Sequence, residues 1–509
     1  MISEGYSVAT GELAPGFAIV VPTIGRQSVH RLLAELEGSA GPRPSAVILV
    51  DDRADPTPPL SVTSGLPVTV LRSGGRGPAA ARNVGWRSTR APWIAFLDDD
   101  VVPQSNWFDA LADDLAKADI EDAVGSQAVI EVPRVGGRRA TDDERRTQRL
   151  ADAQWITADM AYRRSVLVAV GGFDERFPRA YREDSDLALR ITQAGHGIAH
   201  GSRRCTHPVA TATLMSSVRA QIGNRDNALM HRKHQRGWRA AIGEGRGRLP
   251  AHALTAAAAM TAIGAVGVGR WRIARWSATL WAALTTEFAA RRFWAGPQTL
   301  VEAARILVSS ALIPAAAVMH RIRGEWTFRS ARRDPPLAVL LDRDDTIIED
   351  GPYLRDPAGV RPVPGALDAL GRLREAGLLL AVVTNQSGVA KRLIAPDELI
   401  AVNAKVDAVL GPFDSWQICV HDADDGCRCR KPAPGMVRAA ADALGVDTTR
   451  CVVIGDTGAD VDAALTAGAD AVLVPTERTL RHEISNASAR ARVAATLTEA
   501  VALVLKECR

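Results

Sequence analysis

Cysteine is scarce in this chain, with six residues in 509, which excludes a fold held together by disulfides. An excess of one charge is also lacking. The formal net charge is only +4 and the basic residues form short runs, so we expect no nucleic-acid partner. The first sixteen residues contain neither the basic head nor the apolar run of a signal peptide, which predicts a cytoplasmic protein.

The chain is too long for one ordinary hydrophobic core, so at least two domains are expected. Its composition indicates an α/β domain over residues 1–240, an apolar and basic helical segment with a linker over 241–334, and a second α/β domain over 335–509. In the first zone, apolar runs of strand length alternate with helical patterns, as in a mostly parallel sheet. The strands expected there are 17–22, 46–50, 68–71 and 93–97.

Long hydrophobic runs are missing from the middle zone. Its charge-free stretches are 253–269, 276–286 and 306–319, and none clearly reaches the roughly 20 apolar residues that a spanning helix requires. Their flanks are basic and aromatic, which is typical of helices at a membrane interface. Association with the inner face of a membrane through 250–325 and a helical hairpin packed on its neighbours are equal alternatives. A multi-pass topology is not expected.

In the third zone, after a linker at 329–336, short apolar runs again alternate with helical patterns. This alternation predicts a doubly wound sheet that binds ligands at the carboxyl ends of its strands. The expected strands are 338–341, 378–383, 416–420, 451–454 and 471–474.

The first of these strands runs directly into Asp342 and Asp344. Two carboxylates at this spacing can do different work: one attacks phosphorus as a nucleophile, and the other donates a proton to the leaving oxygen. An isolated pair of this kind is more often a solvated turn. Here the later strands also end in polar residues, and the whole set favours phosphoryl transfer.

The polar residues at the later strand ends complete this set. Thr384 and Asn385 follow the strand at 378–383 and suit phosphoryl oxygens. Lys431 can neutralise charge that builds on the transferring phosphoryl group. Asp456 follows the strand at 451–454 and can share a Mg²⁺ ion with Asp342, because hard cations prefer carboxylate oxygens.

Four metal-ligating side chains crowd into one loop of this zone: Cys419, His421, Cys427 and Cys429. Three thiolates and an imidazole make a closed tetrahedral set, which is the pattern of structural rather than catalytic zinc. The loop leads directly into Lys431, so a bound Zn²⁺ would fix the position of that lysine.

From about residue 337 to the C-terminus, these motifs resemble the haloacid-dehalogenase superfamily of phosphohydrolases. The match is closest to its D-glycero-D-manno-heptose 1,7-bisphosphate 7-phosphatases and histidinol-phosphate phosphatases. The resemblance implies an aspartyl-phosphate mechanism, with Asp342 as nucleophile, Asp344 as general acid and base, and Lys431 as the stabilising charge. It also implies that Asp342, Asp344 and Asp456 hold Mg²⁺. Thr384 and Asn385 would hold the phosphoryl group, and Arg430 would contact the second phosphate of a bisphosphate.

Asp345 departs from the family pattern, because the family usually has glycine at this position. A small residue that tolerates positive φ is lost and a third carboxylate is gained beside the metal. Aspartate tolerates unusual φ better than most residues, so we expect reduced or retuned activity, with inactivation as the alternative.

Acidic residues also follow strands of the first zone. The strand at 17–22 ends in Pro22, the next is followed by Asp52, and the strand at 93–97 runs into Asp98 and Asp100. Such clusters repel each other unless they bind a cation or hydrogen-bond donors. A divalent ion bridging a nucleotide diphosphate to Asp98 and Asp100 would resolve the repulsion, and Asp52 could accept hydrogen bonds from a base or ribose. For any single cluster, a solvated turn is the alternative.

Over roughly 17–207 this arrangement looks like the inverting family-2 glycosyltransferases of the GT-A fold. Residues 155–163 resemble the acceptor-side segment, and the GGFD sequence at 171–174 precedes REDSD at 182–186. The resemblance implies a base in this last motif, with Asp184 the first choice and Glu183 the second.

The same resemblance implies a nucleotide-sugar donor and its metal ion. Pro22 and Asp52 would contact the donor, while Asp98 and Asp100 would hold Mg²⁺ or Mn²⁺. His207 is either a further metal ligand or an ordinary surface histidine.

We therefore expect two separate α/β domains, one GT-A-like and one HAD-like, joined by an apolar helical segment. The expected function is bifunctional: a nucleotide-sugar glycosyltransferase fused to a Mg²⁺-dependent sugar phosphatase, with a heptose bisphosphate favoured as the phosphatase substrate. Three alternatives remain open. The C-terminal half could be a histidinol-phosphate phosphatase or a degenerate interaction domain, and the N-terminal half could bind sugar nucleotides without turnover.

Overall fold

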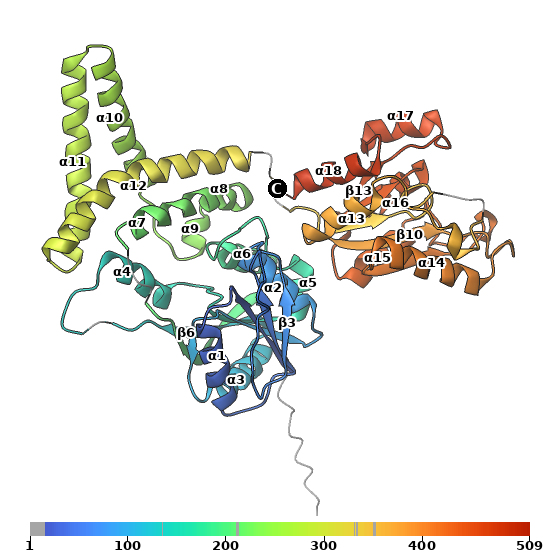
Figure 1. Cartoon of the computed structure of the whole chain (residues 1–509), viewed down its shortest axis with the longest axis horizontal. Helices are drawn as coiled ribbons and strands as arrows, with labels where there is room; N and C mark the ends of the chain where they lie inside the picture. The colour runs from blue at the N-terminus through green and yellow to red at the C-terminus, as the bar shows by residue number, and fades with distance from the viewer. Residues whose placement is uncertain are drawn as a thin grey trace, which may run out of the picture. The chain divides into compact units, whose positions relative to one another are not determined.

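The computed structural model describes residues 16–508, except 135, 210–212, 330, 332–333 and 350–352 (Figure 1). It divides into two compact units, Met1–Phe328 and Arg329–Arg509. Most of the first sixteen residues, on which the prediction of no signal peptide rests, lie outside the described residues. Part of the expected linker at 329–336 also lies outside them.

The first unit is built on an eight-stranded sheet with the order β3-β2-β1-β4-β7-β6-β8-β5. Its strands are β1 (Phe17–Thr23), β2 (Ala46–Asp51), β3 (Val68–Arg72), β4 (Trp93–Leu97), β5 (Val102–Pro103), β6 (Ala123–Glu131), β7 (Asp159–Arg163) and β8 (Gly197–Thr206). The first four strands pair in parallel, as predicted. β7 is antiparallel to both β4 and β6, so the sheet as a whole is mixed.

Helices cover both faces of this sheet, which explains why its first strands are continuous apolar runs rather than alternating ones. One face packs on α1 (Ser28–Gly38) and α3 (Trp107–Ile120). The other face packs on α2 (Pro78–Arg87), α5 (Arg164–Val170) and α6 (Glu183–Gln193). The acidic residues that follow β4 are thereby brought to one edge of the layered domain, near the N-terminus of α6.

The rest of the first unit is helical. Its elements are α4 (Asp142–Gln148), η1 (Arg149–Asp152), α7 (Ser216–Arg219), η2 (Ala220–Ile222), α8 (Gly223–His234), α9 (Trp238–Ala241), α10 (Leu249–Gly267), α11 (Trp271–Ala295) and α12 (Leu300–Thr327). In Figure 1, α10 and α11 form a hairpin that projects from the unit, and α12 runs beside α8.

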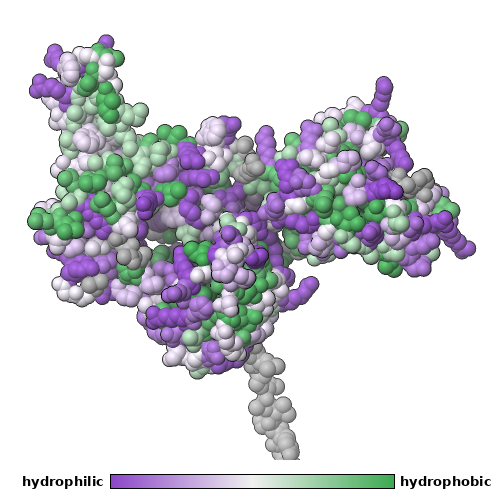
Figure 2. All heavy atoms as spheres, viewed as in Figure 1, coloured by the Kyte–Doolittle hydropathy of each residue, from purple (hydrophilic) through white to green (hydrophobic). Residues whose placement is uncertain are grey.

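Two of these helices, α10 and α12, are long and apolar enough to cross a membrane by length and composition. The expectation that no stretch reaches spanning length is therefore wrong for these two helices. α10 begins four residues before the counted stretch, and α12 continues through charged residues at both of its ends, where a count of charge-free residues stops. Only 28% of the apolar window of α10 and 39% of that of α12 is buried. Figure 2 shows hydrophobic residues exposed along the projecting hairpin.

The second unit has a six-stranded, fully parallel sheet with the order β11-β10-β9-β12-β13-β14. Its strands are β9 (Ala338–Leu341), β10 (Leu379–Asn385), β11 (Ser415–Cys419), β12 (Cys451–Gly455), β13 (Asp470–Leu473) and β14 (Arg492–Val493). From β9 the chain first builds the sheet toward β11, then returns to β12 on the other side. The carboxyl ends of β9 and β12 thus form a topological switch point, where such sheets bind ligands.

Helices cover this sheet on both faces too. α13 (Ala366–Glu375), α14 (Pro396–Leu410) and α18 (Leu497–Glu507) share one hydrophobic core with it. α15 (Gly435–Leu444), α16 (Gly458–Ala467) and α17 (Arg481–Arg490) share the other. The five strands predicted from the sequence lie within two residues of the observed ones, and β9 and β12 are buried along their whole length.

Candidate active sites

At the switch point of the second unit, three carboxylates meet. Asp342 follows β9, Asp456 follows β12, and Asp460 lies in the first turn of α16. Each offers an oxygen within 4.8 Å of the other two, and all three residues are buried. The ammonium of Lys431 lies 2.7 Å from Asp342 Oδ1 and 2.5 Å from Asp460 Oδ1, and it donates to the carbonyl of Val383 at 2.8 Å.

The electrostatics of this cluster fit a divalent cation. Burial raises the pKa of Asp342 to about 7, and Asp460 and Asp344 add to the rise while Lys431 opposes it. Burial also raises the pKa of Asp456 to about 8, assisted by the charges of Asp342 and Asp460. Three buried carboxylates face one ammonium, so the cluster keeps an excess of negative charge that oxygen-seeking cations match.

Asp460, which the predicted ligand set lacked, holds the lysine. One of its oxygens meets the ammonium, and the other accepts hydrogen bonds from the Thr457 hydroxyl at 2.5 Å and the Thr457 amide at 3.1 Å. The sequence signal for this role was an acid one turn after the strand-end Asp456. Asp342 and Asp456 are therefore the two side chains best placed to hold Mg²⁺.

The Asp344 side chain, predicted as a third metal ligand, lies outside the cluster. Its carboxylate pairs with the guanidinium of the buried Arg343 at 2.9 Å and accepts from the Gln386 amide at 2.6 Å. Gln386 also donates to the hydroxyl of Thr384 at 2.9 Å. The predicted ligand role of the Asp344 side chain is therefore corrected, because Arg343 and Gln386 hold it elsewhere.

Asn385, predicted to bind phosphoryl oxygens, is engaged with the backbone of the lysine. Its amide donates to the Lys431 carbonyl at 3.2 Å, and its oxygen accepts from the Lys431 amide at 3.1 Å. Thr384 is buried at the end of β10. Arg430 is half-buried and donates to the His421 carbonyl at 3.3 Å.

The four predicted zinc ligands come together on the loop after β11. The Cys419, Cys427 and Cys429 sulfurs are 3.4 to 3.7 Å apart. His421 Nδ1 lies 3.3 Å from Cys429 and 3.6 Å from Cys419. A tetrahedron with metal–sulfur bonds of about 2.3 Å has edges of nearly this length, so the cluster fits Zn²⁺.

Asp345 has φ of 55°, in the left-handed region that favours glycine. Its carboxylate lies 3.3 Å from the Arg478 guanidinium, and its charge contributes to the raised pKa of Asp456. The position at which the sequence departs from the family pattern thus combines unusual backbone geometry with charge beside the acid cluster.

In the first unit, Asp98, Asp100 and His207 each offer a ligand atom within 4.8 Å of the other two. The Nδ1 of His207 lies 2.8 Å from the Pro208 carbonyl, which can only accept, so Nδ1 donates to it, and Nε2 lies 3.8 Å from Asp100 Oδ1. Burial raises the pKa of Asp100, and the charges of Asp98 and Asp99 add to this while His207 opposes it. This donor set fits a divalent cation.

Arg82, on α2, connects this cluster to the acid pair of α6. Its guanidinium lies 2.8 Å from Asp98 Oδ1 and 2.9 Å from Glu183 Oε1, and the side chain is fully buried. Sequence reasoning missed this role, although an arginine directly after the three alanines near the start of the helix was a usable signal.

Glu183 and Asp184 begin α6. Burial raises the pKa of Glu183 to about 8, with a contribution from Asp184 and opposition from Arg82. Burial also raises the pKa of Asp184. Asp184 keeps partial exposure while Glu183 is buried against Arg82, so Asp184 is the more accessible base.

Asp52 and Pro22, the predicted donor-binding residues, lie at the ends of β2 and β1. The Asp52 carboxylate accepts from the Ser73 hydroxyl at 2.7 Å and from the Gly77 amide at 3.0 Å. Gly77 has φ of 99°, and a Cβ there would meet the Pro178 carbonyl at 2.6 Å. Asp52 therefore holds the tight turn that leads into α2. Pro22 is half-buried near the end of β1, where it is in register with Val50 of β2.

Comparison with known proteins assigns both units. Residues 18–170 match the family model for glycosyl transferase family 2, and residues 428–500 match the HAD-hydrolase-like model. The D-glycero-beta-D-manno-heptose-1,7-bisphosphate 7-phosphatase of Pseudomonas putida is 39% identical over 150 residues, covering 28% of this chain and 86% of that protein. The protein of the same name from Escherichia coli is 32% identical over 163 residues, covering 30% and 85%.

Among solved structures, the D,D-heptose 1,7-bisphosphate phosphatase of B. bronchiseptica, complexed with magnesium and phosphate, is similar at 32% identity and a TM-score of 0.31. It covers 33% of this chain and 99% of that one. The family models and the relatives confirm the resemblance seen in the sequence. The chain therefore belongs to the haloacid-dehalogenase-like phosphatases through its second unit, and its first unit carries a family-2 glycosyltransferase domain.

Proposed function

We propose that the second unit hydrolyses a heptose bisphosphate through an aspartyl-phosphate on Asp342. The observation that carries this proposal is the buried set of Asp342, Asp456, Asp460 and Lys431 at the switch point of the parallel sheet. The substrate class is supported by the relatives named for this activity, of which the chain covers most of the length.

The side chains divide the reaction between them. An Asp342 oxygen attacks phosphorus, the phosphorus–oxygen bond to the sugar breaks, and Asp344 gives its proton to the departing sugar oxygen. Asp344 then takes a proton from water, whose oxygen attacks the acyl phosphate, releasing inorganic phosphate and restoring Asp342. Lys431 orients the nucleophile and offsets phosphoryl charge. Asp342 and Asp456 would hold Mg²⁺, which supplies further positive charge there.

Phosphate release from a panel of sugar bisphosphates, with histidinol phosphate alongside, tests this proposal on the full chain with Mg²⁺. We expect release from heptose 1,7-bisphosphate and its loss in Asp342→Asn, which keeps the shape of the side chain but removes the nucleophile. Asp462→Asn is the matched control, because Asp462 is half-exposed on α16 and pairs with Arg490. Phosphate release that persists in Asp342→Asn would refute the assignment of Asp342 as the nucleophile. A preference for histidinol phosphate would refute heptose bisphosphate as the substrate.

For the first unit we propose transfer of a sugar from a nucleotide sugar to an acceptor hydroxyl. Asp98, Asp100 and His207 would hold Mg²⁺ or Mn²⁺ beside the donor diphosphate, and Asp184 would deprotonate the acceptor. Support comes from the matched family model and from the cation-fitting cluster. Hydrolysis and transfer assays with UDP- and GDP-sugars test it, with Asp184→Asn expected to remove transfer while donor binding persists.

We also propose that the protein works at the cytoplasmic face of a membrane. More than half of the large apolar side chains found exposed among the described residues lie on α10, α11, α12 and their connections. Basic residues flank these helices, as expected where anionic lipids are met.

A further inference from the structure

Beside the base of the α10–α11 hairpin lies a pocket of about 360 Å³ that neither active site uses. Its lining comes from α4, η1, α7, η2, α11, α12 and the residue before α10. Six arginines line it, with Asp142 as the single lining carboxylate: Arg145, Arg146, Arg149, Arg248, Arg291 and Arg292. We call this the arginine pocket.

Two of the six arginines build the wall. Arg292 donates to the hydroxyls of Ser309 and Ser310 at 2.9 and 2.8 Å and to Asp142 at 2.8 Å. Arg145 donates to the Ala140 carbonyl at 2.7 Å and to Asp142 at 3.2 Å. Their donors are largely used, so they fix the shape of the pocket rather than offer it hydrogen bonds.

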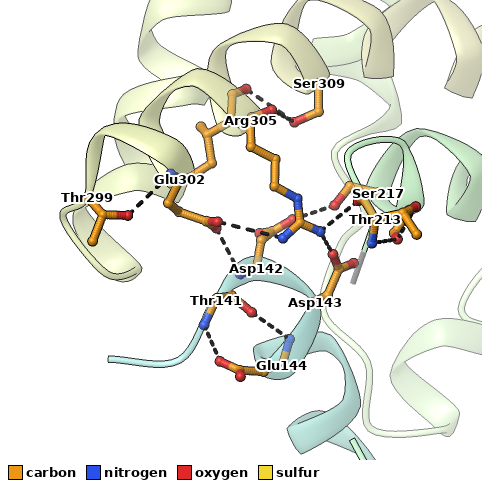
Figure 3. A network of polar contacts seen from close by, with 12 residues as sticks. Thr141, Asp142, Asp143, Glu144, Thr213, Ser217, Thr299, Glu302, Arg305 and Ser309 are labelled. Atoms are coloured by element: carbon orange, nitrogen blue, oxygen red, sulfur yellow. Dashed lines mark hydrogen bonds and ion pairs between the residues drawn. The ribbon is translucent and has the colours of Figure 1, made fainter. Parts of the chain in front are cut away.

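A polar network behind this wall keeps α4 in place. Figure 3 shows Asp142 and Asp143 at the start of α4 facing Arg305 of α12 and Ser217 of α7. The Ser217 hydroxyl donates to Asp142 at 2.9 Å, and Arg305 pairs with Asp143. Arg305 also lies 3.6 Å from Glu302, and these two charges offset each other. The lining arginines on α4 and η1 therefore project from a fixed support.

The other four arginines keep donors for a ligand. Arg146 lies 3.0 Å from Asp143, while Arg248 and Arg291 share Glu287. Within the part of the chain that the structure describes, no carboxylate lies within ion-pair distance of Arg149. Six guanidinium groups thus face three carboxylates, Asp142, Asp143 and Glu287, which leaves an excess of positive charge.

The excess positive charge also affects the pKa values of titratable side chains near the pocket. Burial lowers the pKa of His252, on the first turn of α10, to about 4, and the charges of Arg248 and Arg292 contribute. Burial also lowers the pKa of Arg146, with Asp142 opposing and Arg149 adding to the effect. Burial is the larger cause in both cases, but the arginine contributions have the sign of a cation-rich pocket.

We propose that the arginine pocket binds a phosphate or diphosphate group. Arginine forks match phosphate oxygens in pairs, and grouped arginines at the rim of a preformed cavity give such a group several charge-assisted hydrogen bonds. The guanidinium groups of Arg248 and Arg292 both pack against the ring of Phe288, at 5.2 and 5.3 Å from its centroid. The proposal does not depend on either enzymatic activity.

The phosphate can come from a soluble compound or from a lipid headgroup. The second source is within reach because the helices that leave the pocket rim, α10 and α11, are those with exposed apolar surface. Both sources present the same chemistry to the arginines, so separate arms of one experiment must distinguish them.

The first arm follows the ring signal of His252 by NMR in the full chain while inorganic pyrophosphate is added at neutral pH. This signal is local to the pocket, so pyrophosphate held in either active site does not move it. We expect a saturable shift in the wild type, weakened about tenfold or more in Arg146→Gln combined with Arg149→Gln. Arg31→Gln, on α1, is the control, because Arg31 is exposed and pairs only loosely with Glu35 at 3.8 Å.

The second arm measures flotation of the same proteins with phosphatidylcholine vesicles, with and without phosphatidic acid. Phosphatidate-dependent binding that the double variant loses, with Arg31→Gln unaffected, assigns the pocket to a lipid phosphate. A His252 shift that the double variant weakens, without such a loss in flotation, assigns it to a soluble phosphate, whereas a shift that the double variant leaves unchanged counts against the pocket. The single variant Arg291→Gln, at a side chain 70% exposed, guards against misfolding and should show a smaller loss in the same arm. An unmoved His252 signal together with unchanged flotation of the double variant would overturn the proposal.

Discussion

At the scale of single residues, the phosphatase centre is dominated by carboxylates held close together out of water. Asp342 and Asp456 both have pKa values raised by burial and by neighbouring acids. The ammonium of Lys431 partly balances these charges, and it is shared between Asp342 and Asp460. The centre is therefore strained by charge until a cation enters, and its behaviour should depend on both pH and metal.

The first prediction concerns that dependence. Because burial raises the pKa values of Asp342 and Asp456 above the ordinary value of 3.8, folding favours their protonated forms. In the metal-free protein, the contribution of these two groups to the free energy of unfolding is fully present below about pH 4. It is lost as the pH rises to about 8, and the loss is on the order of a few kcal/mol. Calorimetric melting should show this fall, and Mg²⁺ should raise the melting temperature most at the alkaline end.

Asp456→Asn is the control for this measurement. It removes one of the titrating groups and one of the Mg²⁺ ligands, so both the pH slope and the metal response of the second unit should shrink. A metal-free protein whose melting temperature is flat between pH 4 and 8 would contradict the prediction.

The second prediction concerns Asp345. Replacing it with glycine removes the strained left-handed aspartate and one negative charge near Asp456. We expect Asp345→Gly to raise kcat/KM on the heptose bisphosphate several-fold. Asp345→Ala separates the two causes, since it removes the charge but leaves a Cβ at φ of 55°, and it should gain less. A loss of activity in Asp345→Gly would show that the carboxylate takes part in the reaction.

At the scale of elements, the loop after β11 is the part of the second unit that depends most on a ligand. Its side chains are mostly polar or metal-binding, and its apolar residues Val420 and Ala423 are exposed, so little apolar burial stabilises it. The same loop delivers Lys431 to the end of β10 through the amide of Asn385. Order in the loop and the position of the catalytic ammonium are thus physically connected.

The third prediction follows from this connection. Cys427→Ser should remove about one zinc per chain and lower both the melting temperature of the second unit and phosphatase kcat, because structural zinc contributes directly to folding. Cys508→Ser is the matched control, since that half-buried cysteine lies on the C-terminal side of α18, outside the cluster. Elemental analysis and activity assays check it. Full activity in wild-type protein that contains no zinc would rule out the structural role.

Elements also show how far sequence reasoning reached. Apolar runs such as β1, β4 and β9 are buried from both faces, and this pattern is visible without a structure. β8 was missed because it carries Arg203, which is fully buried between Asp114 at 2.9 Å and Asp159 at 2.8 Å. Ion pairs between residues so far apart leave no local pattern.

The candidate sites divide in the same way. Strand-end residues such as Asp342 and Asp98 could be found from their position after an apolar run. Residues whose role depends on a contact with a different element could not be recognised from the sequence. Examples are Arg82 on α2, which contacts Glu183, and Asp460, which holds Lys431. The direction of a side chain is equally invisible, which is why Asp344 was expected in a cluster that it does not join.

At the scale of the whole molecule, the chain combines two enzyme domains with a helical hairpin whose apolar side chains are exposed at the surface. Ile263 on α10 and Trp276 on α11 are 74% and 76% exposed. Such surface on a projecting hairpin, with arginines around it, is typical of a part that meets lipid.

The fourth prediction tests that contact. Ile263→Glu and Trp276→Glu should each reduce binding to anionic vesicles about tenfold, because a charge replaces apolar surface that would enter the interface. Ile120→Glu is the control: Ile120 ends α3 on the sheet domain and is 87% exposed. Flotation measures the effect, and all three variants should keep phosphatase activity. Equal losses in all three would show that the hairpin has no special role.

The shared guanidinium of Arg82 has a consequence for the order of events in the first unit. A cation held by Asp98 would compete with Arg82 for that carboxylate, and the guanidinium charge so released would remain beside Glu183, at the start of the helix that also carries Asp184. Occupancy on the donor side and ionisation on the acceptor side are then thermodynamically linked through one side chain. Binding of the metal-bound nucleotide should accordingly favour ionisation of the acceptor-side acids, and their ionisation should strengthen nucleotide binding by the same factor.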